Sequence, residues 1–208
     1  MTYSTTEAAF FEQAKKLGSS TIFEASDLPT SSVDPLIRPV WSGAAVSGPA
    51  YPVECSPGDN LAIHRALKKV PRGSILVVST GGFVAGYWGE VLTVAAEEAG
   101  VIGLIIDGGV RDIAALIEHK FPVYTRGISV RGTIKASAPS VGEPINFAGT
   151  PVSAGDLVVA DDDGVVIVPA QHAASTLQNA KARFDKEAIM MAALRSGRSS
   201  LELLGLSD

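Results

Sequence analysis

The chain has 208 residues, of which 46% are hydrophobic and 19% charged; this excludes a disordered protein and suits one domain with a full hydrophobic core. Its net charge is −5 and its basic residues are scattered, which argues against nucleic acid as the main partner, because phosphate binding needs a clustered basic surface. Cys55 is the single cysteine, so no internal disulfide can form and a reducing compartment is indicated.

The N-terminal residues lack the pattern of a signal peptide, and no apolar run reaches the roughly 18 residues that a membrane-spanning helix needs. We therefore expect a soluble cytoplasmic protein without a membrane partner, folded as one domain over residues 1–208. The first expected element is a helix over residues 6–16, which "STTE" introduces as a capping box. Residues 21–54 are rich in Pro, Ser and Thr and predict extended, irregular chain, whereas apolar spacing predicts a helix over residues 60–70.

The segment 74–127 alternates continuous apolar strands with helices. Strands are expected at 74–79, 101–106 and 121–127, helices at 90–99 and 112–120, and glycine-rich loops at 80–89 and 107–111. Such a β-α-β-α-β order is typical of a parallel sheet covered on both faces. Right-handed crossovers place both strand-to-helix loops at the carboxyl edge of the sheet, so they should lie side by side around a cleft. The unpaired N–H groups at the two helix starts favour an anionic ligand there.

Beyond residue 126 the pattern changes to shorter, alternating pieces. Antiparallel strands are expected at 128–137 and 144–149, and residues 156–169 predict a hairpin with apolar arms. A long amphipathic helix over about 171–195 follows, and it should pack on the sheet or on a neighbouring subunit.

Arg111 and Asp112 are the main candidates for chemistry in the cleft. Arg111 offers a fixed fork of donors for a carboxylate or a carbonyl oxygen. Asp112 has an ordinary interpretation as an N-cap, which the sequence alone favours, and a functional one as an oxygen ligand for a magnesium-type cation. Glu90 starts the preceding helix and should face the same cleft, although an acid in a first helical turn is common because it complements the helix dipole.

Other residues of the loops receive mainly structural interpretations. Asp107 either lines the mouth of the cleft or caps the turn, and the structural role is favoured. Gly108 and Gly109 would permit a positive φ or the close approach of a ligand. Lys135 is a rival candidate as a Schiff-base lysine, but nothing near it in the sequence would lower its pKa.

The remaining motifs do not predict a site. The sequence has no dinucleotide fingerprint, Walker motif, paired-cysteine zinc spacing or H-E-x-x-H motif. "DDDG" at 161–164 begins like a calcium loop but has His172 where the last ligand should be Glu, so it predicts a turn. His64 and His119, like His172, stand on expected helices without a clear partner, which favours surface or structural roles.

Three segments, "GYWGEVLTVAAEEAGVIGLIIDGGVRD", "FPVYTRG" and "GDLVVADDDGVVIVP", resemble the RraA-like superfamily over roughly residues 20–195. That superfamily contains regulators of ribonuclease activity and metal-dependent aldolases of 4-hydroxy-4-methyl-2-oxoglutarate and 4-carboxy-4-hydroxy-2-oxoadipate. The resemblance implies an α/β fold of the swivelling β/β/α type, assembled as a homotrimer or hexamer with the site near subunit boundaries.

The resemblance also implies roles for residues in the cleft. Asp112 and waters would hold Mg²⁺ or Mn²⁺, and Arg111 would bind the keto and carboxylate oxygens of a 2-oxo acid. Backbone N–H groups near Val91 and Leu92, next to Gly89, would hold the pyruvyl carboxylate.

Two acids complete the implied site. Glu90 stands where the family often has Asp, and it either orients a metal-bound water or touches the substrate. Glu187 on the C-terminal helix matches an acid that reaches a neighbouring subunit's site in the aldolases, with Asp185 close to it in sequence.

The expected function is therefore a divalent-metal-dependent aldolase. It would cleave a 4-hydroxy-2-oxo acid to pyruvate and a second oxo acid through a metal-stabilised enolate, with Arg111, Glu90 and Glu187 as catalytic residues. Oxaloacetate decarboxylation is the expected side activity. The alternatives are a non-catalytic regulator that binds a ribonuclease and a related lyase for another 2-oxo acid.

Overall fold

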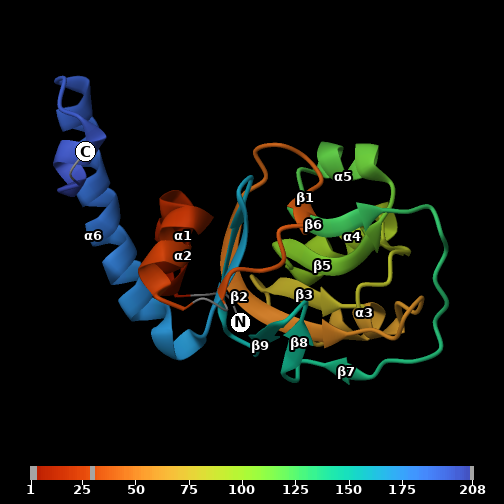
Figure 1. Cartoon of the computed structure of the whole chain (residues 1–208). Coiled ribbons are helices and arrows are strands. Elements are labelled where there is room, and N and C mark those ends of the chain that lie inside the picture. The colour runs from red at the N-terminus through yellow and green to blue at the C-terminus, as the bar shows by residue number, and fades with distance from the viewer. Residues whose placement is uncertain (1–3, 29–30, 207–208) are drawn as a thin grey trace.

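The computed structural model describes residues 4–28 and 31–206 and shows an α/β fold (Figure 1). The helices are α1 (Thr5–Leu17), α2 (Ser19–Ser26), α3 (Leu61–Ala66), α4 (Glu90–Ala99), α5 (Ile113–His119), α6 (Ala170–Arg195) and α7 (Ser200–Leu204). The strands are β1 (Arg38–Pro39), β2 (Val46–Glu54), β3 (Ile75–Ser79), β4 (Gly86–Trp88), β5 (Gly103–Val110), β6 (Val123–Ile128), β7 (Ser140–Val141), β8 (Ile145–Phe147), β9 (Thr150–Val152), β10 (Leu157–Asp161) and β11 (Gly164–Val168). Among the described residues, no helical segment combines the length and the hydropathy of a membrane-spanning one.

Within the described residues, nine strands form one mixed sheet with the order β1-β6-β5-β3-β2-β10-β11, while β4 pairs with β5 and β7 with β2. Strands β2, β3, β5 and β6 are parallel neighbours, and β10 joins β2 in antiparallel orientation. A separate hairpin of β8 and β9 completes the strands. The expected α/β fold, with a parallel core, antiparallel strands and a long C-terminal helix, is confirmed.

Alternation along the central strands distributes their side chains between two cores. In β3, Leu76 and Val78 join the core that includes residues of α3, α4 and α5, whereas Ile75 and Val77 join the core that includes residues of β8–β11. Because both faces are covered, β3 and β5 are buried along their whole length, as the continuous apolar runs predict. A third core lies between the β10–β11 hairpin and helices α1, α2 and α6.

The N-terminal third is more regular than the sequence predicts. Residues 21–54 were expected to be irregular, but α2 covers part of them and β2 is a nine-residue central strand. The Gly and Pro residues within "VSGPAYPVE" hide the strand pattern, because both residues are disfavoured in strand interiors. The expected helix over 60–70 is present but short, since α3 ends at Ala66.

Two expected loops at the carboxyl edge are also partly strand. The expected end of a strand at residue 106 is wrong, because β5 continues to Val110, and the expected loop 80–89 contains β4. Gly108 and Gly109 do not have a positive φ. Instead they allow close approach of the chain, since a Cβ on Gly109 would lie 2.6 Å from the Ala85 carbonyl oxygen.

The C-terminal region follows the prediction except at one segment. The expected strand over 128–137 is wrong: Ile128 ends β6, where it pairs with Val110, and among residues 129–137 only Ile134 forms a bridge, to Asp59. The hairpin over 156–169 is confirmed, with "DDDG" as its turn. Helix α6 matches the expected span, and its C-terminal part extends away from the sheet (Figure 1).

Candidate active site

A cavity of about 270 Å³ lies at the carboxyl edge of the sheet. It brings together the end of β4, the start of α4 and the residues that follow β5, as the crossover argument predicts. It is lined by Asn60, His64, Gly86, Tyr87, Trp88, Gly89, Val91, Leu92, Arg111, Asp112, Gly132, Thr133 and Lys135.

Arg111 and Asp112 sit side by side in this cavity. The Arg111 backbone N–H donates to the Trp88 carbonyl oxygen at 2.8 Å, which ties the pair to the end of β4. Both side chains are about half exposed, and Arg111 Nε lies 3.8 Å from Asp112 Oδ2. Their charges therefore face a space that a ligand can enter.

The N-cap interpretation of Asp112 is wrong in its usual sense. Its side chain makes no hydrogen bond to the first turn of α5, and its backbone is left-handed, with φ +59°. The carboxylate instead accepts the Glu90 N–H of α4 at 3.1 Å through Oδ2. A non-glycine residue in this conformation is uncommon and concentrates at functional sites, so the geometry favours a role in the cavity.

Gly89, Val91 and Leu92 lie at the start of α4, as expected. Gly89 makes no side-chain cap, and the first N–H groups of a helix have no partners within it. Val91 is 80% exposed, while Leu92 is buried in the core and anchors the helix. The helix start therefore presents backbone N–H groups and a dipole that favour an anion in the cavity.

Glu90 lies at the rim of the cavity and does not line it. Its side chain is 57% exposed, and Oε1 lies 4.0 Å from His119 Nε2. The other ring nitrogen of His119 lies 3.0 Å from Glu97 Oε2. His119 thus bridges two acids of α4, which corrects the expectation that it has no clear partner.

Glu187 is not brought to the cavity within one chain. It pairs with Arg183 on α6, with Arg183 Nε 2.8 Å from Glu187 Oε1, and Arg183 also contacts Glu24. Asp185 pairs with Lys181 at 2.8 Å. Helix α6 lies across the molecule from α4 and α5 (Figure 1).

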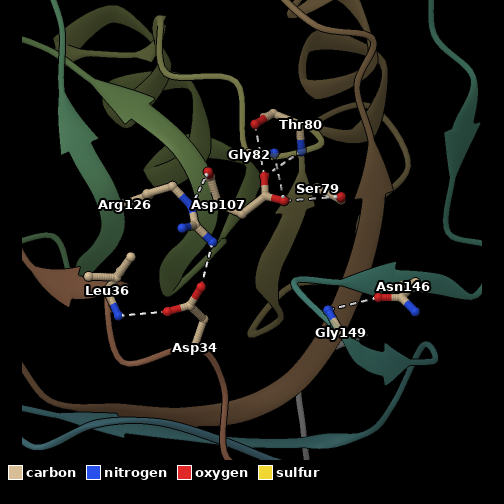
Figure 2. Close-up of polar contacts among 9 residues, drawn as sticks. All are labelled: Asp34, Leu36, Ser79, Thr80, Gly82, Asp107, Arg126, Asn146 and Gly149. Atoms are coloured by element: carbon tan, nitrogen blue, oxygen red, sulfur yellow. Dashed lines mark hydrogen bonds and ion pairs between the residues drawn. The ribbon is translucent and has the colours of Figure 1, made fainter.

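Asp107 has the structural role that was favoured. Figure 2 shows its buried carboxylate facing the turn after β3, where it accepts from the N–H groups of Thr80 and Gly82 and from the Thr80 hydroxyl. Arg126 joins the same region, because Nε donates to the Asp107 carbonyl oxygen and Nη2 lies 2.8 Å from Asp34 Oδ2. Cys55 lies in the crevice beside this network, and burial raises the pKa of its thiol to about 12, which disfavours the reactive thiolate.

Asn60, His64 and Lys135 also line the cavity, and their position beside Arg111 was not predicted from the sequence. Lys135 lies in the segment without strand structure, whereas Asn60 is the N-cap of α3 and His64 lies in the last turn of that short helix. The missed β2 explains this: β2-α3-β3 is another parallel crossover, so the start of α3 reaches the same edge. The helical spacing of "NLAIHRAL" did predict a helix that carries Asn60 and His64, but only the strand before it, β2, places the start of that helix at the edge of the sheet.

Comparisons with known proteins match the chain to one family. The family model RraA-like (Aldolase/RraA) matches residues 19–167. A protein of Halalkalibacterium halodurans, provisionally named 4-hydroxy-4-methyl-2-oxoglutarate aldolase, is 31% identical over 176 residues, which are 84% of this chain and 83% of that protein.

Solved structures agree in fold. A crystal structure of an uncharacterized protein from Pseudomonas syringae pv. tomato has a TM-score of 0.84 at 29% identity and covers 96% of this chain and 94% of its own. RraAS2 of Streptomyces coelicolor, described as an unusual member of the RNase ES inhibitor RraA family, has a TM-score of 0.80 at 24% identity, with 89% and 98% covered.

Proposed function

We propose that this chain, which belongs to the RraA-like family, is an aldolase that cleaves a 4-hydroxy-2-oxo dicarboxylic or tricarboxylic acid to pyruvate and a second oxo acid. The observation that carries the proposal is a single cavity in which Arg111, Asp112 and the start of α4 meet. The relative from Halalkalibacterium halodurans, with its provisional aldolase name, supports the same reaction class.

The donor set of the cavity agrees with a hard divalent cation. Asp112 presents a half-exposed carboxylate, and one carboxylate with several waters is a usual way to hold Mg²⁺. Among the described residues, no group of three His, Cys, Asp or Glu side chains forms a cage of the zinc type. Asp112 would therefore hold Mg²⁺ or Mn²⁺. When bound, the ion supplies a Lewis acid for the oxygens of the 2-oxo acid.

The chain's own groups would bind the pyruvyl half and stabilise its developing charge. The N–H groups at Val91 and Leu92 hold the C1 carboxylate at the start of α4. The Arg111 guanidinium stabilises the negative charge that forms on the C2 oxygen when the C3–C4 bond breaks. From the rim, Glu90 orients water beside Asp112. Oxaloacetate develops the same charge when it loses carbon dioxide, so its decarboxylation is an expected side activity.

Oligomerisation would complete the site, and a homotrimer or hexamer agrees with the exposed apolar surface. A closed cyclic assembly repeats one contact between two different surfaces of the chain. Apolar residues are exposed near the cavity on one side and on the C-terminal helices on the other. The first group is Val91, Ile128, Val130 and Ile134, and the second is Phe184, Ile189, Met191, Leu194, Leu201 and Leu204.

The test is pyruvate release from 4-hydroxy-4-methyl-2-oxoglutarate, 4-carboxy-4-hydroxy-2-oxoadipate and oxaloacetate. With Mg²⁺ or Mn²⁺ we expect turnover of at least one hydroxy acid and of oxaloacetate. Chelation with EDTA should abolish both, and added Mg²⁺ should restore them, because the carboxylate of Asp112 cannot polarise the keto group by itself. Absence of turnover by the folded, metal-supplemented protein would refute the aldolase and favour a ribonuclease-binding regulator.

Replacing Gly89 by Ala should lower activity by roughly 10- to 100-fold, because small displacements of catalytic groups are costly. A Cβ at residue 89 would overlap Asp112 Oδ2 and lie 3.1 Å from Arg111 Cγ, so both side chains must move. Gly132→Ala is the matched control, since it also lines the cavity but its Cβ would meet no atom within 4 Å. Steady-state kinetics of the two variants compare them, and equal activities would show that the Gly89 contact does not position the pair.

A further inference from the structure

One wall of the cavity carries polar atoms without partners. Among the described residues, four buried side-chain N or O atoms lack a hydrogen-bond partner, and two of them, Asn60 Oδ1 and His64 Nε2, belong to residues of this cavity. Asn60 is only 5% exposed, and its Nδ2 donates to the Tyr87 carbonyl oxygen at 2.9 Å, which fixes the amide. Native proteins seldom leave buried polar atoms unpaired, so this wall is built for a polar ligand.

His64 is in the neutral form that a general base requires. Burial, and after it the positive charge of Lys135, lower the pKa of His64, so its ring is neutral near pH 7. His64 lines the cavity, and in the tautomer with the proton on Nδ1 its unpartnered Nε2 is a free acceptor. The acceptor Asn60 Oδ1 lies on the same wall, one helical turn before His64.

The proposed reaction needs such a group. Cleavage starts with removal of the proton from the C4 hydroxyl, and a general base must lie within hydrogen-bond reach of it. Glu90 is exposed at the rim and does not line the cavity, whereas His64 does.

We propose that His64 is the catalytic base of the cleavage, an inference that rests on the proposed aldolase function. Nε2 takes the proton of the C4 hydroxyl, and the O–H electron pair becomes the second bond of the new C4 carbonyl. The electrons of the broken C3–C4 bond form the pyruvate enolate, whose oxygen Arg111 stabilises. The protonated His64 then returns its proton to C3, which gives pyruvate and restores the neutral ring.

Comparing hydroxy-acid cleavage with oxaloacetate decarboxylation distinguishes a catalytic role of His64 from a structural one. Oxaloacetate loses carbon dioxide without deprotonation of a hydroxyl, so its decarboxylation does not need the base in the first step. His64→Gln and His64→Phe should lower kcat/KM for cleavage of 4-hydroxy-4-methyl-2-oxoglutarate by about 100- to 1000-fold, within the range that general-base catalysis contributes. Oxaloacetate decarboxylation should change by no more than about threefold, because Arg111, which stabilises the developing enolate, is unchanged in these variants.

The controls assign any failure to one cause. Glu90→Gln should not show the contrast between the two substrates, and His172→Gln, an exposed histidine on α6, should leave both reactions unchanged. Imidazole added to His64→Ala should recover part of the cleavage, which a purely structural role would not allow. An equal loss of both reactions in the folded variants, or no loss at all, would overturn the base assignment. If the wild-type protein cleaves no hydroxy acid, the aldolase proposal itself fails, and the base assignment with it.

Discussion

Replacing Arg111 by Lys should lower kcat/KM for pyruvate release by roughly 100- to 1000-fold, the usual cost of removing a donor that stabilises a developing oxyanion. Lys keeps the charge but loses the planar fork that binds a keto and a carboxylate oxygen together. The Arg111 side chain is half exposed and forms no part of the buried cores, so the variant should fold normally. Arg65→Lys, at an exposed position of α3, is the matched control and should retain full activity.

Asp112→Asn tests the other half of the pair. Asn keeps the size of the side chain and an oxygen that can accept the Glu90 N–H, but it removes the negative charge. Activity should fall by at least about 100-fold, and the Mg²⁺ concentration for half-maximal activity should rise, because Mg²⁺ prefers carboxylate oxygens. Substantial activity in both variants would show that the cavity is not where the chemistry occurs. Normal Mg²⁺ dependence in Asp112→Asn would remove this residue as the metal ligand.

The parallel β-α-β-α-β core was predictable because its signal is local. Continuous apolar runs bounded by glycine indicate buried strands, and the handedness of crossovers then places Arg111, Asp112 and the start of α4 at one edge. What could not be predicted depends on contacts far apart in sequence. In β2 the residues Gly48, Pro49 and Pro52 interrupt the sequence pattern of a strand. The strand forms because it pairs with β3 and β10, and not because its own residues favour it.

The failure to predict β2 also explains why one wall of the cavity was not predicted. If β2 is not recognised, α3 cannot be placed relative to the sheet. Asn60 and His64 then appear in the sequence as isolated polar residues. The position of Asp112 shows a second limit. A helix start preceded by Asp predicts an N-cap, but the left-handed backbone turns its carboxylate toward another helix, which no local pattern encodes.

Glu187 lies outside the cavity of its own chain, and its proposed role requires a neighbouring subunit. Beyond Ala180, α6 contains no buried residue among those described, although it continues to Arg195. At about 1.5 Å per residue this part spans roughly 22 Å. A helix that exposes Phe184 and Ile189 gains little stability unless these side chains pack on another surface. A second copy offers such a surface in the exposed apolar residues near the cavity.

Glu187→Gln should therefore lower kcat/KM by about 10- to 100-fold, as loss of a charged group that assists proton transfer does. Asp185→Asn is the matched control, because it also removes an i,i+4 ion pair of α6, the one with Lys181, and it should leave activity unchanged. The proposal that Glu187 acts in a neighbouring subunit's site predicts complementation. Co-expressed Arg111→Ala and Glu187→Gln chains, each carrying a different tag, should form mixed assemblies in which some sites receive both native residues.

Random mixing in a closed ring gives about a quarter of the sites a native Arg111 and a native Glu187, so mixed assemblies should recover up to about a quarter of the wild-type activity. Mixtures of Arg111→Ala with Asp112→Asn must recover nothing, because these neighbours lie on one chain and every site keeps a defect. Recovery only in the first mixture would place Glu187 in a neighbour's site. Equal behaviour of the two mixtures, with assembly verified by light scattering, would confine the site to one chain and make the exposed face of α6 an assembly surface without a catalytic role.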